Sequence, residues 1–387
     1  VQKKTMLSQN GQCTLTGTLS RLVQHRLCKV IRPTTLSIEP NASCQLRCPE
    51  CPQTSKGYPP VIGSGYLKFS DFKNIIDRNP QIRGVDLQNL GEIFLNPDIL
   101  PIMEYAYRRN VAIRCSCSTN LNTVSEAVLE GLVKYRFREL PCAIDGASDE
   151  IYRIYRVGGN FDRVIRNIRT INRYKKMYRC EFPKLTWLFV VFGHNEHELH
   201  RAKELAAELR MQFTARKNWN PKHSPVRDKE HVMKEAGWST IARDKSYEIT
   251  GKHFLRYMCY SLWRSPQINW DGKILGCCMN KWGEFGKNAF TDGYIDSINS
   301  QEMADARAML MGRIGPRNNL PCSVCMLYSK LRETGNYITA GEISDSRTPL
   351  RKVAAYVYRR SFVVWFENVC LRRSIRDFFP RANTLPE

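Results

Sequence analysis

The chain has 387 residues, of which 42% are hydrophobic and 25% are charged. This composition is typical of a globular protein and excludes a disordered or fibrous one. The length suffices for one large domain with a smaller one, or for two medium domains. The formal net charge of +22 predicts attraction to an acidic partner, such as nucleic acid, an anionic membrane surface or a phosphorylated substrate. No nucleic-acid-binding motif accompanies this charge, so we do not expect a nucleic-acid partner.

The location of the protein is predicted from its apolar segments and its cysteines. No apolar run is long enough to span a bilayer, and the N-terminus has no signal-peptide core. We therefore expect a cytoplasmic protein. Fifteen cysteines in a large chain of this kind favour metal binding or catalysis over a disulfide framework.

Strand and helix patterns alternate through the first half of the chain, after a polar, basic stretch at 1–33. Amphipathic helical patterns separate the strands, with Ser70 as the expected N-cap of the first helix, and Asn96 as cap with Pro97 at the first helical position of the second. This alternation predicts an α/β fold with a parallel sheet, open or partly closed as a barrel, and a site at the carboxyl ends of its strands. The expected strands lie at 34–40, 84–92, 111–120, 138–146, 184–195 and 211–219.

The pattern changes after about residue 220. The stretch "PQINWDGKILGCC" (266–278) predicts a β-hairpin around Gly272. From Pro349 the chain is basic, aromatic and helical in pattern. We expect an N-terminal basic extension (1–33), an α/β core (34–225), a second domain (226–335) and a basic aromatic C-terminal extension (336–387). We expect the last segment to pack as a helix on the second domain with its basic side in water, and peripheral membrane contact is the alternative.

Three cysteines, Cys44, Cys48 and Cys51, follow the first predicted strand with the spacing C-x3-C-x2-C. A structural zinc site needs four protein ligands, so zinc would require a distant fourth residue. A 4Fe–4S cluster normally has one thiolate on each iron, and three thiolates leave one iron open for a ligand.

In this context the triplet resembles the signature of the radical S-adenosylmethionine (SAM) superfamily, which lies in the loop after the first strand of a partial (β/α)6 TIM-like barrel. The resemblance implies that SAM chelates the open iron of a 4Fe–4S cluster. It also implies that an electron from an external reductant, such as flavodoxin or ferredoxin, cleaves SAM to a 5′-deoxyadenosyl radical that abstracts hydrogen from a substrate. Glu50 departs from the aromatic residue that many members carry before the third cysteine.

Further positions match SAM-contacting segments of the family. "LGEI", with Gly91 and Glu92, resembles the "GGEP" motif that contacts the methionine ammonium. "CSTN" supplies Ser118 and Asn120 at the end of the third predicted strand. In "AIDGASDEIYRIYR", Asp145 lies near the site, and Arg156 is expected to pair with the methionine carboxylate. Each also has a plain structural explanation: a turn at Asp145, a surface charge at Arg156, and a helix cap at Asn120.

A second set of cysteines lies towards the C-terminus, and folding of the predicted hairpin brings its members together. A four-cysteine zinc ribbon is one explanation. The spacing also resembles the SPASM domain in its shorter twitch form, which implies one auxiliary 4Fe–4S cluster. Cys278 points to the other face of its strand from its neighbour, as a packed residue or an active-site thiol. The expected ligands are Cys259, Cys277, Cys322 and Cys325.

The expected reaction is the oxidation of a small molecule such as a sugar or aminocyclitol, anionic or phosphorylated, with the auxiliary cluster as electron relay. The cysteine pattern is similar to that of 2-deoxy-scyllo-inosamine dehydrogenase-like enzymes. Three alternatives stay open: a peptide-modifying enzyme of ribosomal peptide maturation, an epimerase that uses Cys278 as hydrogen donor, and a zinc-stabilised basic binding protein without enzymatic activity.

Overall fold

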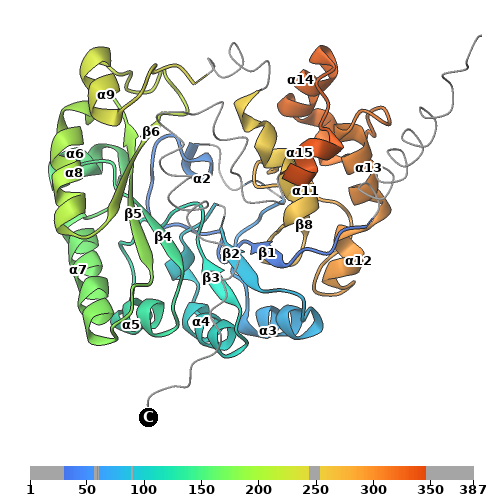
Figure 1. Ribbon diagram of the computed structural model, residues 1–387, viewed down its shortest axis with the longest axis horizontal. Coiled ribbons are helices and arrows are strands. Elements are labelled where there is room, and N and C mark those ends of the chain that lie inside the picture. The colour runs from blue at the N-terminus through green and yellow to red at the C-terminus, as the bar shows by residue number, and fades with distance from the viewer. Residues whose placement is uncertain (1–29, 56–58, 60, 89, 244–252, 346–387) are drawn as a thin grey trace, which may run out of the picture.

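The computed structural model describes residues 30–345 apart from 56–58, 60, 89 and 244–252 (Figure 1). Residues 1–29 of the predicted N-terminal extension, and the basic aromatic segment from 346 onwards, lie outside the described residues. Among the helices that are described, none is long and apolar enough to cross a membrane.

Six parallel strands form the wall of the core, each inside a stretch that the sequence pattern predicts. The first three form one sheet, in which β3 pairs with β2 and β2 with β1. The other three form a second sheet in the order β4-β5-β6. The predicted α/β fold with a parallel sheet is confirmed. The strands are β1 (Thr35–Ile38), β2 (Gly84–Leu87), β3 (Ala112–Arg114), β4 (Glu139–Ala143), β5 (Lys184–Val191) and β6 (Gln212–Lys217).

The two sheets join beyond the end of β3. Thr119 forms an isolated parallel bridge with Cys142 of β4. Its N–H donates to Pro141 O (2.9 Å), and its carbonyl accepts from Ala143 N–H (2.8 Å). The six strands therefore curve into one partial barrel, and side chains that follow the strand ends converge at one rim.

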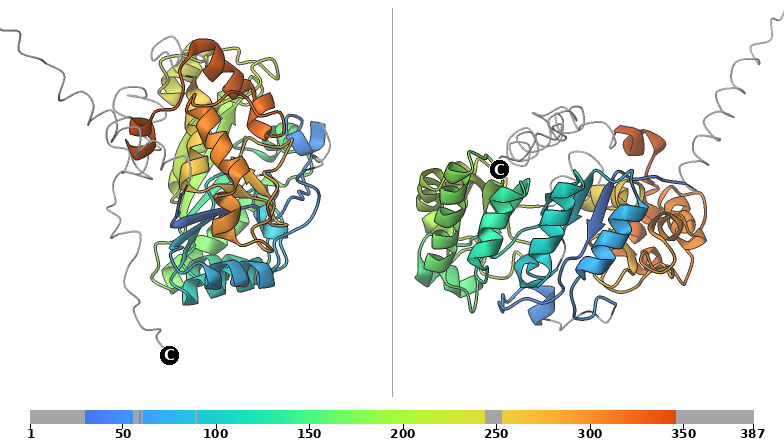
Figure 2. Two further views of the ribbon diagram at one scale, coloured as in Figure 1. Left: turned by 90° about the vertical axis from the view of Figure 1, so that its right-hand side faces the viewer. Right: turned by 90° about the horizontal axis from the view of Figure 1, so that it is seen from below.

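Helices cover the outer face of this wall. Figure 2 (right) shows α3, α4, α5 and α7 as a row of blue-to-green helices along one side of the molecule, and neighbours in that row are in contact. The core helices are α2 (Pro52–Ser55), α3 (Phe69–Arg78), η1 (Ile93–Leu95), α4 (Ile99–Arg108), α5 (Glu126–Lys134), α6 (Asp149–Tyr155), α7 (Phe161–Met177), η2 (Glu196–Glu198), α8 (Leu199–Glu208) and α9 (Lys229–Ala236).

Two predicted helix starts are wrong. Helix α3 begins at Phe69, before the expected cap Ser70, and the Phe69 N–H donates to the distant carboxylate of Asp98 (2.8 Å). Helix α4 begins at Ile99 with Asp98 at the N-cap position. Asn96 instead accepts the Asp98 N–H (2.7 Å) in the turn before the helix, so the helix starts two residues later than expected. Both errors arise because tertiary and turn hydrogen bonds replace the local cap.

The predicted hairpin is present, and it extends the core sheet. Strands β7 (Gln267–Ile268) and β8 (Ile274–Gly276) are antiparallel, with Gly272 at φ +88° in the turn between them. β7 also pairs in parallel with β1, which gives a five-stranded sheet in the order β3-β2-β1-β7-β8. The C-terminal elements therefore continue from the core sheet. They are η3 (Phe254–Tyr260), α11 (Ser261–Arg264), α12 (Tyr294–Ile298), α13 (Gln301–Leu310), η4 (Pro321–Val324), α14 (Met326–Thr334) and α15 (Ala340–Asp345).

The strands alternate between an apolar outer face and a polar inner face. In β1, Leu36 and Ile38 are buried in the hydrophobic core, whereas Ser37 lies between them and bonds to the Ser265 hydroxyl (2.7 Å). In β2, Asp86 takes the corresponding inward position. This period-two pattern places polar side chains inside the partial barrel, where a substrate and a polar cofactor could be held.

Candidate active site

The cysteine triplet lies at the carboxyl end of β1. Cys44, Cys48 and Cys51 occupy the loop between β1 and α2, and the Cys51 N–H donates to Cys48 O (3.1 Å). Burial, with smaller contributions from negative charge on Glu92, Cys48 and Cys51, raises the pKa of the Cys44 thiol to about 11. The three thiols are thus within electrostatic reach of one another.

Gly91 fixes this cysteine loop from the end of β2. A Cβ atom on Gly91 would lie 1.7 Å from Asn41 O, so this approach admits only glycine. The neighbouring Glu92 N–H donates to Ser43 O (2.8 Å), and Asn41 Nδ2 donates to Glu92 O (3.0 Å). The segment after β2 is therefore pressed directly against the residues that precede Cys44.

The Glu92 side chain joins the ends of β2 and β3. Its carboxyl group accepts hydrogen bonds from the Asn120 N–H (2.7 Å), the Phe94 N–H (3.4 Å) and the Thr119 hydroxyl. Glu92 is 2% exposed, and burial raises the pKa of its carboxyl group, although these donors oppose that shift. The family resemblance leads us to expect Glu92 to face a methionine ammonium. In the structure both of its oxygens accept internal hydrogen bonds, one of them from Thr119, which the sequence analysis did not single out.

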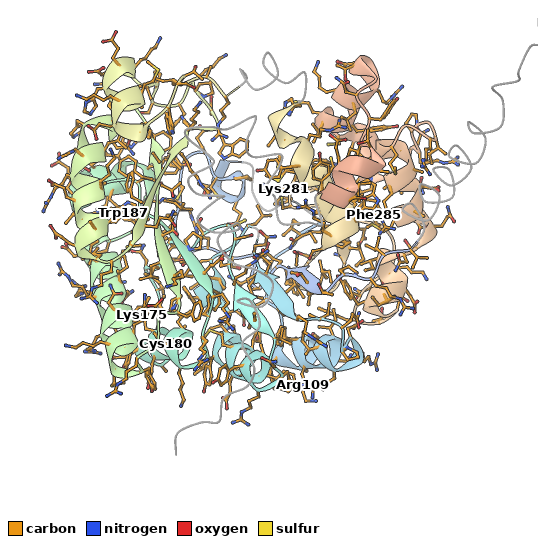
Figure 3. The ribbon with its side chains drawn as sticks, viewed as in Figure 1. Arg109, Lys175, Cys180, Trp187, Lys281 and Phe285 are labelled. Atoms are coloured by element: carbon orange, nitrogen blue, oxygen red, sulfur yellow. The ribbon has the colours of Figure 1, made fainter. Side chains whose placement is uncertain are left out.

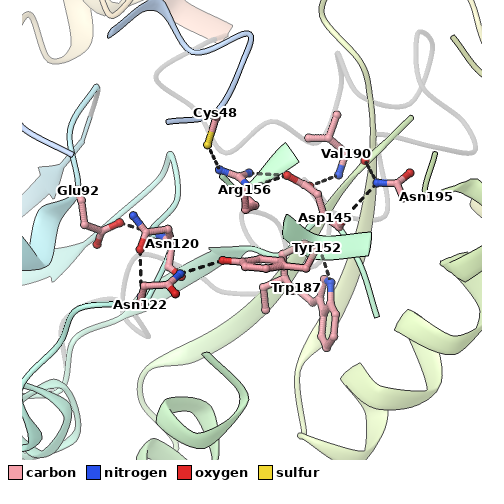
Figure 4. Close-up of polar contacts among 11 residues, drawn as sticks. Cys48, Glu92, Asn120, Asn122, Asp145, Tyr152, Arg156, Trp187, Val190 and Asn195 are labelled. Atoms are coloured by element: carbon pink, nitrogen blue, oxygen red, sulfur yellow. Dashed lines mark hydrogen bonds and ion pairs between the residues drawn. The ribbon is translucent and has the colours of Figure 1, made fainter. Parts of the chain in front are cut away.

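Asn120 lies against the triplet. Its Nδ2 approaches Cys44 Sγ at 3.6 Å, and its Oδ1 accepts from Gln45 Nε2 (2.9 Å). A chain of amide contacts continues away from the thiols, because Asn122 bonds to Asn120 and donates to the Tyr152 hydroxyl at 2.8 Å (Figure 4). Asn120 is thus held within the rim, which is more than the role of a simple helix cap. Ser118 lies in the same segment and is half-buried.

Arg156 and Asp145 form a buried ion pair beside Cys48. The Arg156 guanidinium contacts Asp145 Oδ2 through Nε and Nη2, both at 2.7 Å, and its Nη1 lies 3.8 Å from Cys48 Sγ (Figure 4). Burial lowers the pKa of Arg156, but attraction by Asp145 and Cys48 more than offsets burial and raises the pKa, so the group stays charged. Asp145 also accepts the Val190 N–H (2.7 Å). Arg156, expected to bind a methionine carboxylate, has a carboxylate partner within the protein.

Glu50 ties the cysteine loop to the segment after β6. Its carboxylate accepts from Asn220 Nδ2 (3.1 Å) and lies 3.4 Å from His223 Nδ1. The His223 ring contacts the ring of Phe192 edge-on, with centroids 5.8 Å apart. The residue that departs from the family pattern is therefore a contact point with another wall of the barrel, and no local sequence signal indicates its partners.

The four C-terminal cysteines gather at the end of the hairpin. Burial raises the pKa of the Cys259 thiol well above its usual value, and charge on the other three would raise it further. Burial raises the pKa of Cys277 to about 12. Cys259 lies in η3, Cys277 follows β8, and Cys322 and Cys325 lie at η4 and the start of α14. Cys278 has different surroundings, with its Sγ 3.4 Å from Met258 Sδ.

Both sets of thiols fit a metal cluster. All cysteines in the described segments are free. Within those segments no three or more His, Cys, Asp or Glu side chains are placed to hold a single metal ion. Thiolates on different irons of a cluster lie farther apart than the ligands of one ion. Burial raises the pKa of five of these thiols and so disfavours their thiolates, a cost that a bound cationic metal removes; the five are Cys44, Cys48, Cys259, Cys277 and Cys322.

A family model of the radical SAM superfamily matches residues 38–206, which include the triplet and the segments carrying Glu92, Asn120 and Arg156. The chain carries a radical SAM domain. Enzymes with this domain bind a 4Fe–4S cluster and SAM, and residues 38–206 carry the domain in this chain. In this domain Cys44, Cys48 and Cys51 are the residues that would hold the cluster.

Known proteins similar to the chain include one curated relative and several solved structures. Mycofactocin maturase MftC from two strains of Mycobacterium tuberculosis is 26% identical over 159 residues, which are 41% of this chain and 39% of the relative. The match thus spans well under half the length of that relative. Streptococcus suis SuiB bound to S-adenosylmethionine has a TM-score of 0.56 at 15% identity, over 84% of this chain and 78% of that one. The anSMEcpe structure with AdoMet and the Kp18Cys peptide has a TM-score of 0.50 at 16% identity, over 76% and 87%. The solved structures support the partial-barrel fold.

Proposed function

We propose that this radical SAM enzyme modifies a peptide, with the C-terminal cysteines holding an auxiliary 4Fe–4S cluster. The placement of Cys44, Cys48 and Cys51 at the carboxyl end of β1, with N–H groups of Asn120 and Arg156 aimed at two of the thiols, carries the radical SAM part. Such donors stabilise negative charge on thiolate ligands.

The peptide part is supported by the relatives. MftC is a maturase, SuiB has been solved bound to precursor peptide SuiA, and anSMEcpe has been solved with a peptide. The small sugar or aminocyclitol that the cysteine pattern suggests receives no support from these proteins. A peptide therefore replaces it as the proposed substrate, and oxidation stays part of the proposal.

When bound, the 4Fe–4S cluster supplies the electron that cleaves SAM and so provides a 5′-deoxyadenosyl radical for hydrogen abstraction. The residues of this chain then have separate tasks. Glu92 and Gly91 hold the cysteine loop against the strand ends. Arg156 keeps a positive charge beside Cys48. Asn120, beside Cys44, and Ser118 would offer polar groups at the rim to a bound SAM.

The four C-terminal cysteines suit an electron acceptor. A site with four thiolates is fully ligated, so it has no open iron for a substrate. Oxidation of a peptide by hydrogen abstraction leaves a substrate radical that must lose one further electron. We propose that Cys259, Cys277, Cys322 and Cys325 hold the group that takes up this electron, while the accompanying proton passes to water.

The test begins with anaerobic reconstitution of the full chain and of two cysteine variants. We expect wild type to form 5′-deoxyadenosine from SAM and dithionite. Cys44→Ala should abolish this product and lose roughly half of the bound iron. Cys259→Ala should also lose roughly half of the iron but keep SAM cleavage. Wild type that binds iron yet forms no 5′-deoxyadenosine would contradict the radical SAM assignment.

The substrate class is tested with the same reconstituted protein. Tiled synthetic peptides from small open reading frames near the gene are incubated with enzyme, SAM and dithionite, and their masses are measured. We expect one peptide to change mass in step with 5′-deoxyadenosine formation, and only in reactions containing SAM. Turnover on cyclitols or sugars, together with unchanged peptides, would restore the small-molecule alternative.

A further inference from the structure

The backbone that leads into the cysteine triplet is paired with a later segment, residues 62–67. Asn41 forms an isolated antiparallel bridge with Tyr66. Beside this bridge, the Ala42 N–H donates to Gly65 O (2.9 Å). Segment 62–67 therefore forms one wall of the passage by which the chain enters the cysteine loop.

The tip of the β7–β8 hairpin holds segment 62–67 in place. The Trp270 indole N–H donates to Ile62 O (2.8 Å), and Asn269 Nδ2 donates to the same carbonyl oxygen (3.0 Å). The Asn269 side chain is fully buried and Trp270 is half-buried. Two neighbouring side chains, 207 and 208 positions away along the chain, thus bond to one carbonyl oxygen of this segment.

The Trp270 ring also covers Gly65, where it leaves no room for a side chain. A Cβ atom at Gly65 would lie 2.4 Å from Trp270 Cη2 and 2.6 Å from each of Cζ2 and Cζ3, and these are its three nearest atoms. Gly65 is not among the glycines with a positive φ, so its backbone conformation is open to other residues. The ring of Trp270 alone therefore requires glycine at this position.

A small apolar cluster joins the hairpin to the entrance of the cysteine loop. Ala42, Ile62 and Leu275 are fully buried together, and Trp270 packs against them. Leu275 lies in β8, and the N–H of Phe285 donates to a carbonyl of that strand (3.0 Å). Figure 3 shows Phe285 among the C-terminal elements, so the cluster links those elements to the chain that leads into the triplet.

We infer that Trp270 is a positioning residue for SAM cleavage, because it fixes the segment that pairs with the entrance of the cysteine loop. The inference rests on the proposed cluster at Cys44, Cys48 and Cys51. Trp270 acts through segment 62–67, whose hydrogen bonds determine where the chain turns towards Cys44. In a site that depends on alignment, a displacement of about 1 Å costs about 100-fold in rate.

The first test measures the position of the loop without measuring activity. Hydrogen–deuterium exchange is followed by mass spectrometry in the full chain, both reconstituted and metal-free. Trp270→Ala should speed exchange by about 10-fold in the peptides covering 41–44 and 62–67, and leave β4 and β5 unchanged. The matched control is Trp282→Ala, since the Trp282 indole N–H also donates to a main-chain carbonyl, Pro321 O (2.8 Å), outside this segment. Unchanged exchange in Trp270→Ala, or faster exchange throughout the chain, would contradict the inference.

The second test measures 5′-deoxyadenosine formation from SAM and dithionite in the reconstituted protein without substrate. Trp270→Ala should bind as much iron as wild type but cleave SAM about 10-fold to 100-fold more slowly. Trp270→Phe keeps a ring over Gly65 without the indole N–H, so its rate should recover part of this loss. Trp282→Ala should match wild type. A wild-type rate in Trp270→Ala, or a rate that falls only in step with iron content, would refute a positioning role.

A double-mutant cycle tests the contact between Trp270 and Gly65 itself. Gly65→Ala alone should slow SAM cleavage, because the added methyl group overlaps the ring. In the Trp270→Ala background the same substitution should cost little more, because the ring that excludes the methyl group is gone. Residues in contact show such coupling, whereas independent sites have multiplicative effects on the rate. Multiplicative losses would therefore count against the inference.

A failure of the proposed cluster gives a different result. Wild type would then load no iron at the triplet, or would form no 5′-deoxyadenosine, and both proposals would fall together. An active wild type with an equally active Trp270→Ala would overturn this inference alone.

Discussion

Replacing Asp145 by asparagine tests whether the buried ion pair holds the rim of the barrel together. Asp145 is fully buried and the Arg156 side chain is 16% exposed, so the guanidinium would keep its place with its charge uncompensated. Removing one partner of such a pair costs about 3–5 kcal/mol. The asparagine oxygen can still accept the Val190 N–H, so the loss should reflect the pair alone.

The effect is measured by urea denaturation of the metal-free protein, followed by tryptophan fluorescence. Trp187 is a suitable reporter because it is buried and its indole N–H donates to the carbonyl of Ile144, next to Asp145 (2.8 Å). The control is Glu333→Gln, which removes an exposed pair with Lys330 and should cost less than about 1 kcal/mol. Equal denaturation midpoints for Asp145→Asn and Glu333→Gln would refute the reasoning.

Three further predictions concern the cysteine loop and the carboxylates around it. Gly91→Ala should force the loop away from Asn41 and prevent loading of the first cluster, seen as a loss of roughly half of the bound iron. The control Gly84→Ala, at the start of β2, should load normally because a Cβ there meets only ordinary contacts at 3.7 Å or more. Glu39→Gln should become more stable relative to wild type as pH rises from about 4.5 to about 8, by up to a few kcal/mol at about 1.4 kcal/mol per pH unit. The reason is that folded wild type keeps a proton on Glu39 that its unfolded chain releases, so wild type loses stability over this range. A constant difference in the free energy of unfolding between the two proteins would show that Glu39 is ionised when folded. Glu50→Ala should free the cysteine loop from the segment after β6. The electron paramagnetic resonance signal of the reduced first cluster should then broaden, while the iron content stays the same. A signal identical to that of wild type would show that this contact is dispensable.

The sequence predicted the parallel strands because each is a short apolar or alternating run followed by polar residues. It also predicted that the hairpin would gather Cys259 and Cys277, since a turn at Gly272 brings its two ends together. The helix starts at Ser70 and Asn96 were misplaced because Asp98 forms hydrogen bonds that the local sequence does not reveal. Its carboxylate accepts the Phe69 N–H from a distant segment, and its own N–H donates to the Asn96 side chain in the turn before α4.

Contacts between distant segments were not predictable from local patterns. Thr119 has no distinguishing sequence signal, and only the structure shows that its hydroxyl donates a hydrogen bond to the Glu92 carboxyl group. Glu50 looked like a departure from a motif, and its partners lie about 170 residues further along the chain.

The pairing of β7 with β1 sets the separation of the two cysteine sets. Glu39 N–H donates to Ile268 O (2.9 Å) just before the chain enters the triplet loop, and β8, which leads to Cys277, pairs with β7. Backbone hydrogen bonds of a sheet allow little change in strand spacing. Electron tunnelling slows exponentially with distance, so this shared sheet would hold the distance, and with it the electron-transfer rate, constant between groups bound at the two cysteine sets.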